Sequence, residues 1–115
     1  MSRELRLLVE WESVLHKILN STEKFPKKVR FSFVQRIDGL VLDITQTIVS
    51  AQYSPTNRQA SCIEDLNRQL AHMRLLLRIS TDRRYISTGL LSVLIEDLDG
   101  IGFQANAWLR SVRDG

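Results

Sequence analysis

Residues that end helices are scarce in this sequence. Its 115 residues include only 5 glycines and 2 prolines, the two residue types that most often mark turns. Few turns are therefore available, which favours a small number of long helices over many short strands. The length suits one hydrophobic core, so we expect a single domain over residues 1–115.

Cysteine and long apolar runs are also nearly absent. Cys62 is the single cysteine, so no disulfide can form within the chain and nothing indicates secretion. The longest apolar runs, such as Leu40–Leu42, cover three or four residues. A membrane-spanning helix needs roughly 20. Charged residues near the start stand where a secretion signal would need a hydrophobic stretch. We therefore expect a cytoplasmic, soluble protein without membrane contact.

Apolar residues recur at spacings of three and four over four stretches, which predicts four amphipathic helices. We expect helices over about residues 5–21, 27–53 and 56–84, and a fourth that begins after Ser87. The third has the clearest apolar face, formed by Leu66, Leu70, Met73, Leu77 and Ser80. Four helices with short connections and no strand pattern predict an all-α fold, an up-down-up-down antiparallel four-helix bundle.

Local patterns mark the ends of these helices. Pro26 suits the start of the second helix, where its missing N–H has little cost. Thr56 with Gln59 resembles a capping box and predicts the start of the third, and Ser87 is the expected N-cap of the fourth. Gly39, inside the second helix, predicts a close contact at that point.

The sequence offers little that could support catalysis or metal binding. His16 and His72 lack the neighbours of any known ligand pattern, and Cys62 has no cation or base beside it. The acidic residues from Glu96 to Asp99 point in different directions around a helix and are expected to form a solvated face. We predict no enzyme, no cofactor and no metal site.

Basic residues give a better candidate for function. The formal charge is +3 and the isoelectric point is about 9.4, which permits a polyanionic partner without requiring one. In an antiparallel bundle the start of the second helix and the end of the third share one end. That topology would gather five cations into one basic rim: Lys27, Lys28, Arg30, Arg83 and Arg84. Such a rim would bind phosphates with strong salt dependence.

Three more arginines extend this set along the helices. Arg36 follows the rim on the second helix, and Arg74 and Arg78 share one side of the third. The alternative is that these cations are only solvated and that Asp82 pairs with Arg78 at a spacing of four. The spacing alone leaves both interpretations open.

Several segments in this order resemble a known family. They are TEKFPK from Thr22, QRI from Gln35, MRLLLR from Met73, DRRYIS from Asp82 and DLDGIG from Asp97, followed by Trp108-Leu109. Together they resemble the accessory variability determinant (Avd) proteins of diversity-generating retroelements, within the four-helix-bundle superfamily that includes proteins encoded by ribosomal RNA intervening sequences. The chain departs from the family pattern at Asn106 and Ala107, where two glycines are common, and at Phe103, where a basic residue is common.

The resemblance implies an accessory protein and not a catalyst. Avd proteins form a barrel-shaped homopentamer with a positively charged surface, bind nucleic acid and associate with the retroelement's reverse transcriptase in mutagenic retrohoming. It therefore implies a reverse transcriptase, RNA, DNA and further copies of the chain as partners. By the same resemblance, Arg74 and Arg78 are the leading candidates for polymerase or RNA contact.

A second hypothesis belongs to a different class of protein. A structural or protein-interaction bundle of the intervening-sequence type would have no nucleic-acid role of its own. The small net charge and the acidic residues from Glu96 to Asp99 favour it. RNA binding at low salt separates the two hypotheses.

Overall fold

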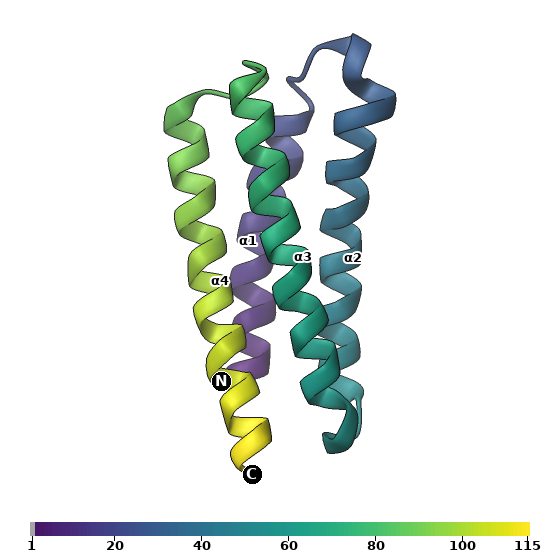
Figure 1. Cartoon of the computed structure of the whole chain (residues 1–115), viewed down its shortest axis with the longest axis vertical. Coiled ribbons are helices and arrows are strands. Elements are labelled where there is room, and N and C mark those ends of the chain that lie inside the picture. Colours follow the sequence, from purple (N-terminus) through teal and green to yellow (C-terminus); the bar gives the residue numbers. More distant parts are fainter. Residues whose placement is uncertain (1) are drawn as a thin grey trace.

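Four long helices form the structure, a computed structural model that describes residues 2–115 (Figure 1). Their bounds are Arg3–Thr22 for α1, Gln35–Tyr53 for α2, Thr56–Asp82 for α3 and Thr88–Asp114 for α4. Each helix runs antiparallel to the one before it, and no strand occurs among the described residues. The predicted up-down-up-down bundle is confirmed.

The helices are arranged as a square. Helix α1 packs against α2 and α4, and α3 packs against the same two helices. Helices α2 and α4 therefore lie on opposite sides of the bundle, as Figure 1 shows. The bundle measures 47 × 25 × 21 Å, which is long compared with its width.

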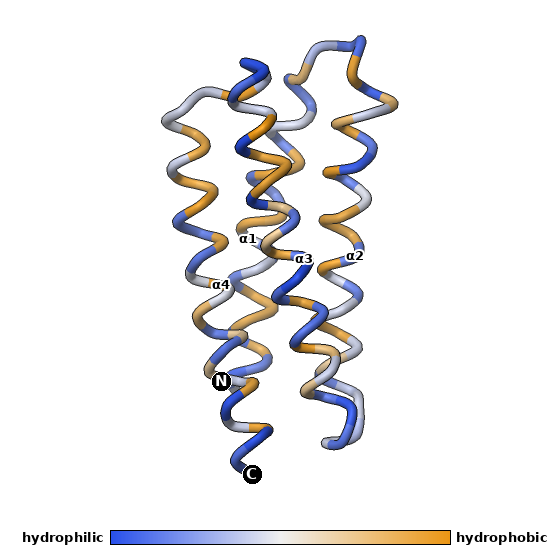
Figure 2. The backbone as a smooth tube through the Cα atoms, viewed as in Figure 1, coloured by the Kyte–Doolittle hydropathy of each residue, from blue (hydrophilic) through white to orange (hydrophobic). Residues whose placement is uncertain are grey.

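The core follows the predicted apolar faces. Orange, hydrophobic segments alternate with blue ones along every helix in Figure 2, as expected for amphipathic helices. The predicted face of α3 is buried from Leu66 to Ser80, and the Ser80 hydroxyl donates to the Leu76 carbonyl oxygen at 2.8 Å. Trp11 is also buried, and its Nε1 donates to Thr45 Oγ1 at 2.9 Å. In the described part of the chain, no helix is long and apolar enough to cross a membrane.

The capping box predicted at the start of α3 is wrong. The helix does begin at Thr56, but the N-cap residue is Pro55 and no side chain caps the helix. The Pro55 carbonyl oxygen accepts from the backbone N–H groups of Arg58 and Gln59. The Gln59 side chain instead donates to the Ala51 carbonyl oxygen at 3.1 Å, which ties the start of α3 to the end of α2. By contrast, the predicted Ser87 cap is confirmed, because its hydroxyl accepts from the Leu90 N–H at 3.1 Å.

The predicted helix over residues 27–53 is continuous but not uniformly α-helical. It opens with a 3₁₀ turn, η1 (Lys27–Val29), followed by a π turn, η2 (Arg30–Val34), and only then becomes α2. The N–H of Gln35 bonds to the Arg30 carbonyl oxygen, five residues back, so this turn is wider than an α-helical one. The apolar spacing of the sequence does not distinguish these three kinds of turn.

Candidate nucleic-acid interface

An aromatic cluster holds two connections together at one end of the bundle. The Tyr85 ring, from the connection between α3 and α4, contacts two rings from the connection between α1 and α2. The centroids are 5.4 Å apart for Phe25 and 5.3 Å apart for Phe33. Such pairs contribute about 0.5–1.5 kcal/mol each beyond simple burial. The two basic segments next to these rings are therefore fixed at the same end, as the topology predicted.

The basic rim consists of Lys27, Lys28, Arg30, Arg83 and Arg84. All five side chains are exposed. The ion pairs found in residues 2–115 involve none of them. Between Lys24 and Ile37 the sequence has five cations and no carboxylate. The rim is a cationic surface without a neutralising partner in the described chain.

The backbone at Arg84 is strained. Its φ is 64°, in the left-handed region that favours glycine. The Tyr85 N–H bonds to the Ser80 carbonyl oxygen at 2.8 Å and the Arg84 N–H to that of Thr81 at 2.9 Å, the two bonds of a Schellman motif. A non-glycine residue in this conformation costs on the order of 1 kcal/mol. The position that would suit glycine holds an exposed cation.

Arg83 is positioned by the same tyrosine that joins the two connections. Its Nε donates to Tyr85 Oη at 3.5 Å, and this hydrogen bond raises the pKa of Arg83 above its ordinary value. Like any arginine, Arg83 is charged at every physiological pH. The aromatic cluster, whose main role is packing, also orients one cation of the rim.

Phe31 is a candidate residue that the sequence patterns did not single out. It lies in η2, directly after Arg30, and its side chain is 84% exposed. The apolar pattern predicts burial for the neighbouring Phe33, which packs on Tyr85, but makes no statement about Phe31. A bare aromatic ring among lysines and arginines is typical of surfaces on which nucleic-acid bases stack.

Arg36, in the first turn of α2, is exposed and continues the rim along the bundle. Arg78 is exposed as well, and no ion pair with Asp82 forms among the described residues. It lies about 7.5 Å along the helix axis from Arg83, at 1.5 Å per residue, and roughly 140° around the helix from it. Arg36 and Arg78 are therefore exposed cations on two neighbouring helices, near the end of the bundle that carries the rim.

Arg74 differs from the other predicted contact residues. Its Nε donates to Asp99 Oδ1 at 2.9 Å and its Nη2 to the Leu98 carbonyl oxygen at 3.4 Å, so it joins α3 to α4. A Cβ at Gly102 would lie 3.0 Å from Arg74 Nη2, so the guanidinium rests on this glycine. The close contact predicted at Gly39 is wrong, because nothing lies within 4 Å of a Cβ placed there.

The acidic residues of α4 are only partly solvated. Asp99 accepts from Arg74, and Asp97 pairs with Lys17 of α1 at 2.8 Å. Glu96 is exposed. The predicted solvated acidic face is therefore confirmed for Glu96 and Asp99, both of which are exposed, although Asp99 also pairs with Arg74. It is wrong for Asp97, which is half-buried against Lys17.

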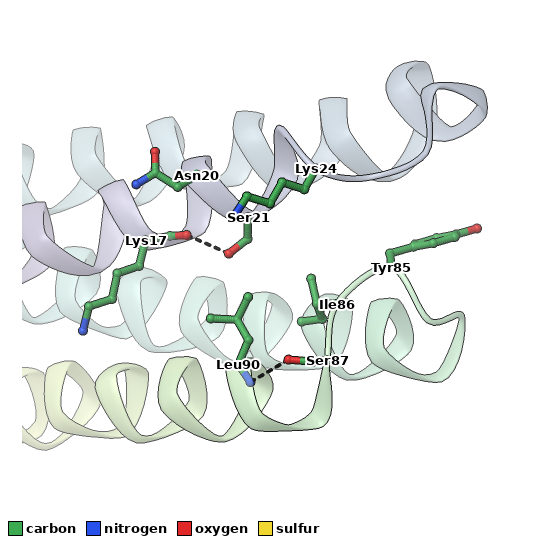
Figure 3. A pocket seen from close by; sticks show the side chains of 8 residues that line it. All are labelled: Lys17, Asn20, Ser21, Lys24, Tyr85, Ile86, Ser87 and Leu90. Atoms are coloured by element: carbon green, nitrogen blue, oxygen red, sulfur yellow. Dashed lines mark hydrogen bonds between the residues drawn. The ribbon is translucent and has the colours of Figure 1, made fainter.

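A hollow of about 420 Å³ lies beside the rim, between the end of α1 and the start of α4 (Figure 3). Ile86 and Leu90 point from its wall towards α1, and Lys24 lines its upper part. The hollow combines an apolar wall with two lysines, Lys17 and Lys24. Within residues 2–115, no three His, Cys, Asp or Glu side chains come close enough to hold a metal ion.

Comparison with known families gives one match that covers most of the chain. A family model described as bAvd-like matches residues 6–112, which cover all of α2 and α3 and most of α1 and α4. No curated protein and no solved structure matches.

Proposed function

The chain belongs to the bAvd-like family, and from this membership we propose that it is a nucleic-acid-binding accessory protein of a retroelement reverse transcriptase. In this role it supports mutagenic retrohoming, in which a template RNA is copied into error-containing cDNA that diversifies a target gene. The family is of an accessory, non-catalytic kind. The protein therefore contributes binding and positioning, and the polymerase performs the chemistry.

The observation that supports nucleic-acid binding best is the basic rim. Five exposed cations from two connections lie at one end of the bundle, and none has an ion-pair partner in the described chain. Cations that the fold does not use for itself are free to neutralise phosphates and release their counterions. The strained backbone at Arg84 fits this role, because a cation is kept where glycine would be more stable.

Phe31 favours single-stranded nucleic acid as the ligand. Its exposed ring lies next to Arg30, so one base can stack on the ring while the flanking phosphates contact rim cations. Bases in a duplex are already stacked on each other and do not offer a free face. RNA template and newly made cDNA both provide single strands, so we propose RNA as the first ligand and DNA as the second.

Assembly into a homopentamer would multiply this surface. In a ring of upright bundles, the rims of all copies lie on the same side. A single strand that crosses several rims binds more tightly than to one rim, because each further contact is intramolecular. We propose that the reverse transcriptase contacts the same side of the assembly, near Arg36 and Arg78. There it would receive the template RNA that is bound to the rims.

Two measurements test the proposal. Retardation of a single-stranded RNA at 50 mM and 200 mM salt is expected to show binding that weakens steeply as salt rises. Co-purification with the reverse transcriptase of a retroelement is expected to recover the polymerase with the wild-type chain. A chain that retains neither RNA nor polymerase at low salt contradicts the proposal.

A structural or protein-interaction bundle remains the competing function. The observation that favours it is that Arg74, one of the leading predicted contacts, is used within the fold by Asp99. This alternative predicts no RNA retardation even at 50 mM salt. The RNA measurement therefore decides between the two.

A further inference from the structure

The hollow between the end of α1 and the start of α4 differs from other hollows of the described chain. Its volume of about 420 Å³ lies within the range of about 300–1,000 Å³ that is typical of small-ligand sites. No carboxylate lines it, and Ile86 and Leu90 give it an apolar wall. Four other hollows each include a carboxylate, from Glu23, Asp82, Asp99 and Glu96 respectively. Among these five, it is the one that suits an anionic ligand.

Lys24 is the cation of this hollow that the fold leaves free. The other lysine in the lining, Lys17, already pairs with Asp97 at 2.8 Å. Lys24 is exposed, and none of the ion pairs found in residues 2–115 involves it. In Figure 3 its side chain lies along the α1 side of the hollow, across from Ile86 and Leu90. A ligand that enters here meets a cation on one side and an apolar surface on the other, so it needs both an anionic group and an apolar face.

Tyr85 joins the hollow to the basic rim. It lines the hollow, and its hydroxyl accepts from Arg83 of the rim at 3.5 Å. On the α1 side, Lys24 comes three residues before Lys27 of the rim. Both chain segments that border the hollow therefore adjoin cations of the rim, and a strand bound to the rim passes beside the hollow.

We propose that the hollow holds one unpaired nucleotide of the strand that the rim binds, with the base against Ile86 and Leu90 and the phosphate on Lys24. A nucleotide combines the anionic group and the apolar face that the hollow requires, and pockets for single bases use apolar side chains in the same way. This inference rests on the proposed function, because the rim supplies the strand. A base held in the hollow cannot pair, so the bound segment stays single-stranded.

The hollow holds a base mainly through the faces of the base. The Ser21 hydroxyl donates to the Lys17 carbonyl oxygen at 2.7 Å, and the Ser87 hydroxyl accepts from the Leu90 N–H at 3.1 Å (Figure 3). Both serines of the lining are thus already engaged by the backbone, which leaves apolar contact as the main interaction. Contact with the face of a base tolerates all four bases, so we expect little sequence preference.

Filling the hollow tests the contact with the base. Leu90→Phe enlarges a wall residue without a change of charge, so affinity for single-stranded RNA is expected to fall by roughly tenfold with an unchanged salt slope. Leu91→Phe is the matched control, because it makes the same change at the next residue of α4, which does not line the hollow, and should bind as well as the wild type. RNA retardation measures affinity, and circular dichroism confirms that the helices remain. Asn20→Trp blocks the hollow from an exposed position on α1 if Leu90→Phe unfolds. Wild-type affinity in a folded filling variant, or an equal loss in Leu91→Phe, overturns the proposal.

Lys24→Gln tests the contact with the phosphate. Loss of one phosphate contact is expected to lower RNA affinity by about fivefold at 0.1 M salt and the salt slope by about 0.7. Lys17→Gln removes the same charge from the same hollow, but Asp97 already uses that lysine, so this control should lose much less affinity. Lys24→Gln combined with Leu90→Phe should lose less than the product of the two separate losses, because both changes remove one nucleotide. Equal losses in the two lysine variants, or fully multiplied losses in the double variant, contradict the assignment.

A fluorescent base analogue in the strand reports on the base itself. The analogue 2-aminopurine emits weakly while it is stacked and brightly when it is separated from its neighbours. Short RNA strands that carry it at successive positions are expected to brighten at one position or more on binding to the wild type, and not on binding to Leu90→Phe. A base stacked on Phe31 stays dim. If no position brightens, the hollow holds no base.

A free nucleotide separates failure of this inference from failure of the proposed function. Adenosine 5′-monophosphate is expected to shift the methyl resonances of Ile86 and Leu90 in a saturable way, and ribose 5-phosphate, which lacks the base, is not. If the wild type retains RNA but neither the methyl resonances nor the base analogue responds, the inference alone is wrong. If the mononucleotide binds but no RNA is retained at 50 mM salt, the hollow takes a free nucleotide, and the proposed function and the source of the ligand are both wrong.

Discussion

Arginines occur in two contrasting settings in this bundle. Arg83 and Arg84 lie on the connection at one end, exposed and without an ion pair in the described chain. Arg74, in the middle of α3, spans the gap to α4, where Asp99 and a backbone carbonyl oxygen accept from it. The first pair leaves its charge available to a ligand, whereas the second setting uses the charge to join helices. An arginine is therefore a candidate ligand contact only when no carboxylate of the fold already pairs with its guanidinium group.

Removal of rim charge is expected to have the largest effect. A variant with Lys27→Gln, Lys28→Gln and Arg30→Gln loses up to three phosphate contacts, each of which adds about 0.7 to the slope of log affinity against log salt for a single strand. The slope should fall by about 2, and the affinity for single-stranded RNA at 0.1 M salt by about 100-fold. Retardation assays at several salt concentrations measure both.

The control removes the same amount of charge elsewhere. Arg6→Gln, Arg58→Gln and Arg68→Gln change exposed arginines that are outside the rim. This variant should lose much less affinity. Equal losses in both variants would mean that RNA responds to net charge alone and that the rim is not a site.

Periodicity and topology allow one part of this contrast to be predicted from the sequence, namely the positions of the helices and the end of the bundle at which the rim lies. Apolar spacing located the four helices, and antiparallel order then placed Lys27 and Arg84 at the same end. The engagement of Arg74 depends on how α3 and α4 are aligned, since Asp99 is 25 residues away in sequence. No local pattern encodes that alignment. The same holds for Gly102, whose contact with Arg74 exists only across the two helices.

Phe31 eluded prediction for a different reason. The apolar spacing of this segment includes Phe33 but not Phe31, and η2 is a π turn, so the spacing indicates no position for the Phe31 side chain. The uninterrupted basic composition around Phe31 was the available clue, because an aromatic residue among cations is as consistent with stacking as with packing.

Phe31→Ala is expected to have the second largest effect on binding. The loss of one stacked base costs about 1–3 kcal/mol, so affinity for single-stranded RNA should fall by roughly tenfold. Because no charge is removed, the salt slope should stay unchanged, in contrast to the rim variant. Phe31→Trp, which keeps an aromatic face, is the matched control and should bind as well as the wild type. A changed salt slope in Phe31→Ala, or unchanged affinity, would rule out stacking.

Arg84→Gly separates charge from backbone strain. Glycine relieves the left-handed conformation at φ 64°, so the free energy of unfolding should rise by about 1 kcal/mol. The lost cation should lower RNA affinity by about fivefold at 0.1 M salt. Urea denaturation and RNA retardation measure the two changes, and Arg84→Lys should alter neither. A glycine variant that is more stable and binds equally well would show that Arg84 has no part in the interface.

Arg74→Ala and Arg78→Ala compare the two settings on a single helix, with the smallest expected effects. Arg78→Ala should lower RNA affinity by up to fivefold at 0.1 M salt and leave stability unchanged, because its side chain is exposed. Arg74→Ala should lower the free energy of unfolding by up to about 1 kcal/mol, the upper range for a partly exposed ion pair, and leave RNA affinity unchanged. Asp99→Asn should be destabilised similarly, and the double variant little further, since both changes remove the same contact. Equal loss of RNA affinity in Arg74→Ala and Arg78→Ala, without loss of stability, would instead place Arg74 in the interface and remove the distinction between the two settings.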